Sequence, residues 1–356
     1  MPEIIGPFTA VSSSVPALEA HVAHLRHLTN TGIALDILRE RFQSTAGQAR
    51  EAAKLIAAHV GQSLAFHEQS RSASPLVRPV LQYYCYLNLA VAAILSYRPI
   101  NFNQYRRHGV EDRTHALSSL ELSSIVVLIN RGAVPLFHSI VSGVSLYGKR
   151  LRLGQLAAGF QMVSHELVTE FGKVSQPIRV DDQITDVSGS WFSEFSFKPV
   201  VKGQTITPKR LEAAMPLLSS DYRLQPIVDD GISYRSIANW NRQSKALRVH
   251  KANGLKLVNF GGHSINSSEF TSPHCVYFWR GVTRIPFLPT LSSILLMSFS
   301  LASVARYRPV LLQKAMASPI HLLIETFVQE ADGVYIPSLR NLLYREEVAI
   351  GPRGLA

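Results

Sequence analysis

The stretch from Phe287 to Ala305 constrains the fold most, because it carries no charged side chain over about 19 residues. It ends at Arg306 and Arg308, and its length is enough for a helix to cross a membrane. However, Pro289 and several hydroxyl side chains dilute the run below the hydrophobicity of a typical span. A helix that is apolar on all sides also suits the centre of a large helical domain. We therefore expect a buried core helix and no membrane partner.

Helical spacing of apolar residues dominates both ends of the chain. In the first 120 residues, helices are predicted from Pro16 onward and over Ile33 to Phe42, Ala46 to His59 and Leu76 to Tyr97. After about Pro286, they are predicted over Thr290 to Tyr307, Val310 to Met316, Pro319 to Gln329 and Pro337 to Arg345. The predicted helix Leu76 to Tyr97 is long, rich in aromatic residues and nearly uncharged, so we expect it to lie at the centre of the helical core.

Alternation replaces helical spacing in the middle of the chain. The β-rich runs Ile125 to Ile129 and Val134 to Ile140 are broken at Arg131-Gly132, which favours a hairpin. A second hairpin is predicted over Lys245 to Phe260, because Asn253-Gly254 favours a two-residue turn between strands. One strand should present an aromatic face through the alternating residues Trp191, Ser193, Phe195 and Phe197.

These patterns predict an α+β protein with helical N- and C-terminal parts packed together and a strand-rich middle region. The expected regions are 1–120, 121–286 and 287–356, and 46% hydrophobic residues suffice for one large core or two ordinary ones. Cys85 and Cys275 are isolated, which indicates neither a disulfide framework nor a paired-cysteine zinc site. The N-terminus lacks the basic segment of a secretory signal. We expect a cytoplasmic protein without a cofactor.

The net charge of +11 is the main global indication of a partner, because a positive field concentrates polyanions near the surface. Residues 231–268 contain no acid, and aromatic side chains interrupt their basic ones, as suits base stacking together with phosphate neutralisation. The predicted nucleic-acid-binding residues are Arg235, Trp240, Arg242, Lys245, Arg248, Lys251 and Lys256. The leading hypothesis is a binding or accessory protein that contacts nucleic acid, within or outside a larger complex. A structural subunit that meets an acidic protein surface is an alternative.

Four short motifs follow one another between Pro79 and Glu347. They are Pro79 to Tyr84, His108-Gly109, Gly132 to Phe137 and Leu296 to Pro309. In this order they resemble the YaaC-like family, which implies a bacterial intracellular protein without an assigned activity and transfers no catalytic residue. The candidate residues that these motifs and their neighbours supply are Gln82, Tyr83, Arg106, Arg107, His108, Arg306, Tyr307 and Arg308.

A second alternative is a divergent HEPN-like ribonuclease. Arg131 and His138 have the spacing of the arginine and histidine signature of those enzymes, but Gly132 and Pro135 between them disfavour a helix interior. His108, with arginines before it, also combines phosphate binding with an acid or base near neutral pH. The catalytic residues therefore stay unassigned.

Metal chemistry is not indicated by the spacing of candidate ligands. The three histidines at His21, His24 and His27 spread over roughly 120° of a predicted helix. The carboxylates Asp181, Asp182, Asp186 and Glu194 lack the acid-x-lysine step of the PD-(D/E)xK nucleases. No metal site is expected.

Overall fold

A computed structural model describes residues 8–39, 46–97, 102–114, 124–163, 166, 175–199, 206–226, 231–257, 274–279 and 288–352. The N-terminal helices are α1 (Ala17–His27), α2 (Thr31–Arg39), α3 (Ala46–Ser72), α4 (Arg78–Tyr97) and α5 (Phe102–Tyr105). The helices of the middle region are α6 (Ala133–Ser142), α7 (Leu153–Ala158), η1 (Gln161–Val163), α9 (Pro208–Ala214), α10 (Pro216–Asp221) and α11 (Gln243–Leu257). The C-terminal helices are α12 (Thr290–Tyr307), α13 (Pro309–Met316) and α14 (Ile320–Tyr344).

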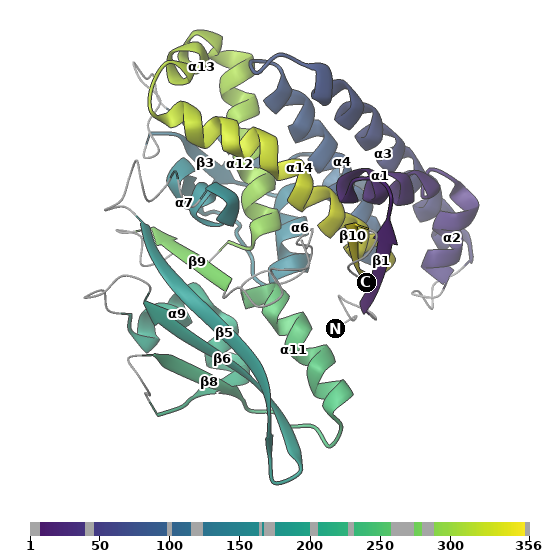
Figure 1. Cartoon of the computed structure of the whole chain (residues 1–356). Helices are drawn as coiled ribbons and strands as arrows, with labels where there is room; N and C mark the ends of the chain where they lie inside the picture. The colour runs from purple at the N-terminus through teal and green to yellow at the C-terminus, as the bar shows by residue number, and fades with distance from the viewer. Residues whose placement is uncertain are drawn as a thin grey trace.

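The described strands form three small sheets. β1 (Phe8–Ser13) pairs in parallel with β10 (Glu347–Pro352), so the two ends of the chain lie side by side (Figure 1). The antiparallel three-stranded sheet consists of β2 (Val110–Asp112), β3 (Val126–Ile129) and β4 (Arg150–Arg152). The antiparallel five-stranded sheet has the order β7 (Tyr222–Leu224), β8 (Ile232–Ser236), β6 (Ser190–Pro199), β5 (Ser175–Val187) and β9 (His274–Trp279).

The helical core confirms that the helical N- and C-terminal parts of the chain pack together. α4 packs against α3, α6, α12 and α14, so helices from both ends of the sequence share one hydrophobic cluster (Figure 1). α4 and α12 are long and apolar enough to span a membrane, but 83% and 72% of their apolar windows are buried inside the fold. Both therefore have the burial of core helices, as the uncharged run predicted.

Three sequence predictions need correction. The run Val134 to Ile140 belongs to helix α6, because a short apolar run fits a buried helix as well as a strand. The predicted break before Pro337 is absent, since α14 continues through this proline. The predicted hairpin at Asn253-Gly254 is wrong, because both residues lie in helix α11. Val258 to Phe260, which end that predicted hairpin, lie outside the described residues.

Burial explains why α11 is a helix. Ala246, His250 and Asn253 are buried, and their i, i+4, i+7 spacing puts them on one face. The Asn253 amide donates to the hydroxyl of Tyr222 at 2.8 Å, across the contact with the five-stranded sheet. A tertiary contact therefore outweighs the local turn preference of Asn-Gly.

The five-stranded sheet and its helices α9 and α10 have a hydrophobic cluster of their own. Its strand β6 buries Ser193, Phe195 and Phe197 and leaves Trp191 half-buried, so the predicted alternation is confirmed. Val163, before this sheet, and Leu288, after it, both belong to the helical core, and Gly159 lies beside Leu288. A Cβ atom on Gly159 would lie 2.8 Å from the Leu288 carbonyl oxygen.

Candidate functional site

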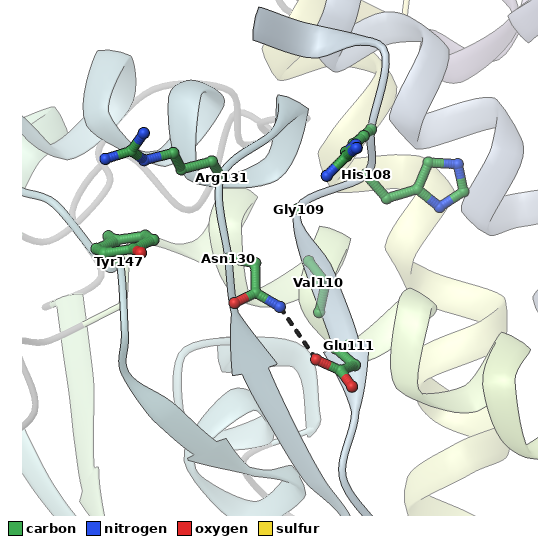
Figure 2. Close-up of a pocket in the computed structure, with 8 residues that line it drawn as sticks. His108, Gly109, Val110, Glu111, Asn130, Arg131 and Tyr147 are labelled. Carbon is green, nitrogen blue, oxygen red and sulfur yellow. Dashed lines mark hydrogen bonds between the residues drawn. The ribbon is translucent and has the colours of Figure 1, made fainter.

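A cavity of about 680 Å³ opens at one end of the three-stranded sheet. Its lining residues are Arg107, His108, Gly109, Val110, Glu111, Asn130, Arg131 and Tyr147. They come from the segment that enters β2, the segment that leaves β3 and the turn before β4. Figure 2 shows Arg131 and Tyr147 on one side and His108 on the other, with Glu111 and Asn130 hydrogen-bonded between the strands.

Two glycines let the segments on either side of this cavity touch. A Cβ atom on Gly132 would collide with the carbonyl oxygen of Arg107 and with the backbone of Gly109. Gly109 itself has φ +78°, in the left-handed region that glycine adopts most easily. The N–H groups of Ala133 and Val134 donate to the carbonyls of residues 107 and 108 at 2.9 and 3.0 Å. Two of the family-like motifs are therefore in direct contact.

Cationic side chains dominate this cavity. Arg107 and Arg131 are exposed, and neither guanidinium has a hydrogen bond or ion pair among the described residues. The Arg131 guanidinium carbon lies 5.6 Å from the centroid of the Tyr147 ring, and this tyrosine is 57% exposed. The cavity thus offers positive charge together with an accessible aromatic ring.

The positive charge continues along the outer face of the three-stranded sheet. Arg150 and Arg152 are exposed on either side of buried Leu151, so they share one face of β4. Residues that are directly paired across neighbouring strands share a face of the sheet. Arg150 pairs with Leu128, and Leu128 pairs with Glu111, so Arg150 lies on the same face as the Glu111 of the cavity. We call the set Arg107, Arg131, Tyr147, Arg150 and Arg152 the cationic face.

Among the described residues that line the cavity, Glu111 is the one with a carboxylate. Its Oε2 atom accepts a hydrogen bond from the Asn130 amide at 3.1 Å, and its Oε1 atom lies 3.0 Å from the Arg113 guanidinium. The side chain is nevertheless 43% exposed. These contacts fix the position of the carboxylate and leave it accessible to a ligand.

His108 links the cavity to the C-terminal motif. Its ring packs edge-on against Tyr83 and Tyr84, with ring centroids 5.5 and 6.1 Å away. Burial and the charge of Arg306 lower the pKa of His108, so the imidazole is neutral at pH 7. The Arg306 guanidinium donates to the Tyr84 hydroxyl at 3.1 Å and also to Tyr307. Motif residues far apart in sequence therefore converge.

Two further motif residues, Arg308 and Gln82, stabilise the fold. Arg308 donates to Asp112 Oδ2 at 2.7 Å and to the carbonyl of Thr114 at 2.8 Å, so this arginine at the end of α12 is paired with a carboxylate and with a backbone carbonyl. Burial would raise the pKa of Asp112, but hydrogen bonds from Ser303, Thr114 and Arg308 outweigh it and lower this pKa. The Gln82 amide donates to the Val328 carbonyl at 2.7 Å inside the helical core.

The predicted basic stretch is divided by the fold. Arg235 is paired with Glu194, and the backbone of Trp240 pairs with that of Trp191. Arg242 and Lys245 are exposed where α11 begins. Arg248, Lys251 and Lys256 belong to α11, but their side chains lie outside the described residues.

His138 lies inside the helical core, whereas Arg131 is exposed. The Nδ1 atom of His138 is hydrogen-bonded to Ser292 Oγ at 2.9 Å, and burial lowers the pKa of this histidine to about 3. The two residues of the ribonuclease-like spacing therefore do not share an accessible surface. The ribonuclease alternative stays a prediction that depends on His108.

A chain of serine, histidine and aspartate that the sequence analysis missed joins α11 to the five-stranded sheet. Ser193 Oγ lies 2.8 Å from His250 Nδ1, and His250 Nε2 lies 2.7 Å from Asp182 Oδ2. Ser193 is fully buried and also hydrogen-bonded to the Tyr222 hydroxyl at 2.9 Å. A hydrolase needs its serine in a cleft that substrate reaches. This arrangement therefore stabilises the fold and is not a nucleophile site.

The described residues define an α+β protein whose helical core carries a cationic cavity on a small sheet. Within this part of the chain, no three His, Cys, Asp or Glu side chains come together as metal ligands. The chain belongs to the YaaC-like protein family, whose model matches residues 26–340. No curated protein and no solved structure matches the chain.

Proposed function

We propose that this chain binds nucleic acid through the cationic face. The observation that carries the proposal is that the four arginines of the cationic face are exposed and have no carboxylate partner among the described residues, and that the exposed ring of Tyr147 lies beside one of them, Arg131. Other arginines of the described residues, such as Arg113, Arg235 and Arg308, have carboxylate partners. Arginines without such partners gain most from a polyanion.

Nucleic acid supplies both kinds of group that this surface accepts. Its phosphates neutralise guanidinium groups and release counterions, and an unstacked base packs on an exposed aromatic ring. The Tyr147 ring and the Arg131 guanidinium are adjacent, so one nucleotide reaches both. Single strands suit the site better than duplexes, because their bases are free to stack on protein side chains.

Fluorescence anisotropy at two salt concentrations tests the proposal with labelled oligouridylate and oligodeoxyuridylate. In the variant Arg107→Ala, Arg131→Ala, Arg150→Ala, affinity should fall and the slope of log affinity against log salt should flatten by about 2. The matched control Arg223→Ala, Arg242→Ala, Lys245→Ala removes the same charge from an exposed residue of the five-stranded sheet and from two exposed residues where α11 begins.

The two variants separate three explanations. A loss confined to the first variant supports the cationic face. An equal loss in both variants would reduce the effect to net charge, and a loss confined to the control would place binding at α11. Wild-type protein that binds neither oligonucleotide would refute the proposal.

A further inference from the structure

We infer that the cavity selects ribonucleotides, with the Glu111 carboxylate accepting a hydrogen bond from the 2′-hydroxyl of a bound sugar. The inference rests on the proposed function, because it concerns the same cavity. It names the class of nucleic acid that the cavity takes, which is RNA.

The first argument is the chemistry of the lining residues. Arg107 and Arg131 attract phosphate, but Glu111 lines the same cavity and repels it. A carboxylate in such a place favours a ligand that brings a hydrogen-bond donor over one that brings only negative charge. In RNA, a hydroxyl donor lies on the same nucleotide as the phosphate, and DNA lacks that hydroxyl.

The second argument is the hydrogen-bonding capacity of Glu111. An ionised carboxylate has about four lone-pair positions. Asn130 and Arg113 use part of this capacity, and the carboxylate remains 43% exposed. Because these neighbours hold the group in place, it is positioned before the ligand binds, which lowers the entropic cost of the new hydrogen bond.

The third argument is the arrangement of groups around the cavity. Its volume of about 680 Å³ is in the usual range for small-ligand sites, and the cavity is open to solvent on one side, so it leaves room for the rest of a strand. Arg131 and Tyr147 lie together on one side, and Glu111 lies with Asn130 toward the sheet (Figure 2). One nucleotide can thus place its base near Tyr147, its phosphate near a guanidinium and its sugar hydroxyl near Glu111.

The test compares oligouridylate with oligodeoxyuridylate, which differ only in the 2′-hydroxyl, at a length of about 12 nucleotides. Wild-type protein should bind the RNA about tenfold more tightly, as expected for one hydrogen bond to a charged acceptor. Glu111→Ala should bring the ratio of the two affinities close to one, while binding to the DNA stays equal or strengthens, because a negative charge is removed.

Arg113→Gln is the matched control, because it breaks the ion pair of Glu111 and retains the carboxylate. This variant should keep most of the preference for RNA, because Asn130 still holds the carboxylate. Equal wild-type affinities for RNA and DNA would overturn the inference and leave nucleic-acid binding intact. A preference that survives in Glu111→Ala would also overturn it. If neither oligonucleotide binds, the proposed function itself fails.

Discussion

His138 should make the folded protein sensitive to acid. This histidine is fully buried and neutral, with a pKa lowered by burial to about 3 from the usual 6.5. Between those two values the unfolded chain binds a proton that the folded chain does not. Stability from this group is therefore complete above about pH 6.5 and is lost progressively as the pH falls toward 3.

The magnitude follows from the difference between the two pKa values. Each unit corresponds to 1.36 kcal/mol, so His138 removes about 3 kcal/mol of stability at about pH 4.5 and about 5 kcal/mol at full protonation. His138→Gln has no titrating group and can still hydrogen-bond to Ser292. We expect its free energy of unfolding to fall less steeply with acid than that of the wild type.

Guanidinium unfolding of both proteins at neutral and at acid pH measures this difference. Ser292→Ala is the control, because it removes the hydrogen-bond partner at 2.9 Å and retains the imidazole. It should lose about 1 kcal/mol at neutral pH and keep the acid sensitivity of the wild type. Parallel pH dependence in wild type and His138→Gln would refute the assignment of a buried neutral imidazole.

Two further substitutions, Gly132→Ala and Asp112→Asn, test contacts near the three-stranded sheet, and Gly333→Ala is the control for the first. Gly132→Ala should lower the free energy of unfolding by about 1–3 kcal/mol, because its methyl group has no room beside residues 107 and 109. Gly333→Ala, in open space within α14, should instead raise it by about 0.5–1 kcal/mol, and urea unfolding compares the two. Asp112→Asn should cost about 1–3 kcal/mol at pH 7, since it weakens the bonds from Ser303 and Arg308. Because the pKa of Asp112 is lowered in the folded chain, its contribution is complete above about pH 4 and is lost progressively as the pH falls through the lowered pKa. Unfolding of this variant and the wild type at pH 7 and about pH 3.5 should show the deficit shrink, and a constant deficit would contradict it.

The helical ends of the chain were predictable because their signals are strong and local. α12 occupies the predicted residues Thr290 to Tyr307, with Pro289 before it and Arg308-Pro309 after it. The run without charge also required burial, and α12 lies in the core. Where the residues that begin and end a helix agree with the need to bury its apolar side chains, the sequence alone predicts the helix.

Contacts between distant segments decided what the sequence did not predict. The Asn-Gly pair indicates a turn, but Tyr222 contacts Asn253 from another element and α11 forms. The cavity escaped notice for the same reason, since Arg107, Arg131 and Tyr147 meet only when three segments assemble. The basic, apolar, basic alternation of Arg150 to Arg152 is visible in the sequence and is typical of an amphipathic strand, and the structure shows these residues as exposed, buried and exposed.

The five-stranded sheet is an insertion in the helical core, because Val163 before it and Leu288 after it both belong to that core. The inserted part has a hydrophobic cluster of its own, and it packs on the helical core where β9 contacts α7 and where α11 contacts α6. A protein tolerates an insertion well when the two ends of the insertion lie close together, because the surrounding chain then keeps its own path. The cationic face lies outside this insertion, on the three-stranded sheet that packs on the helical core.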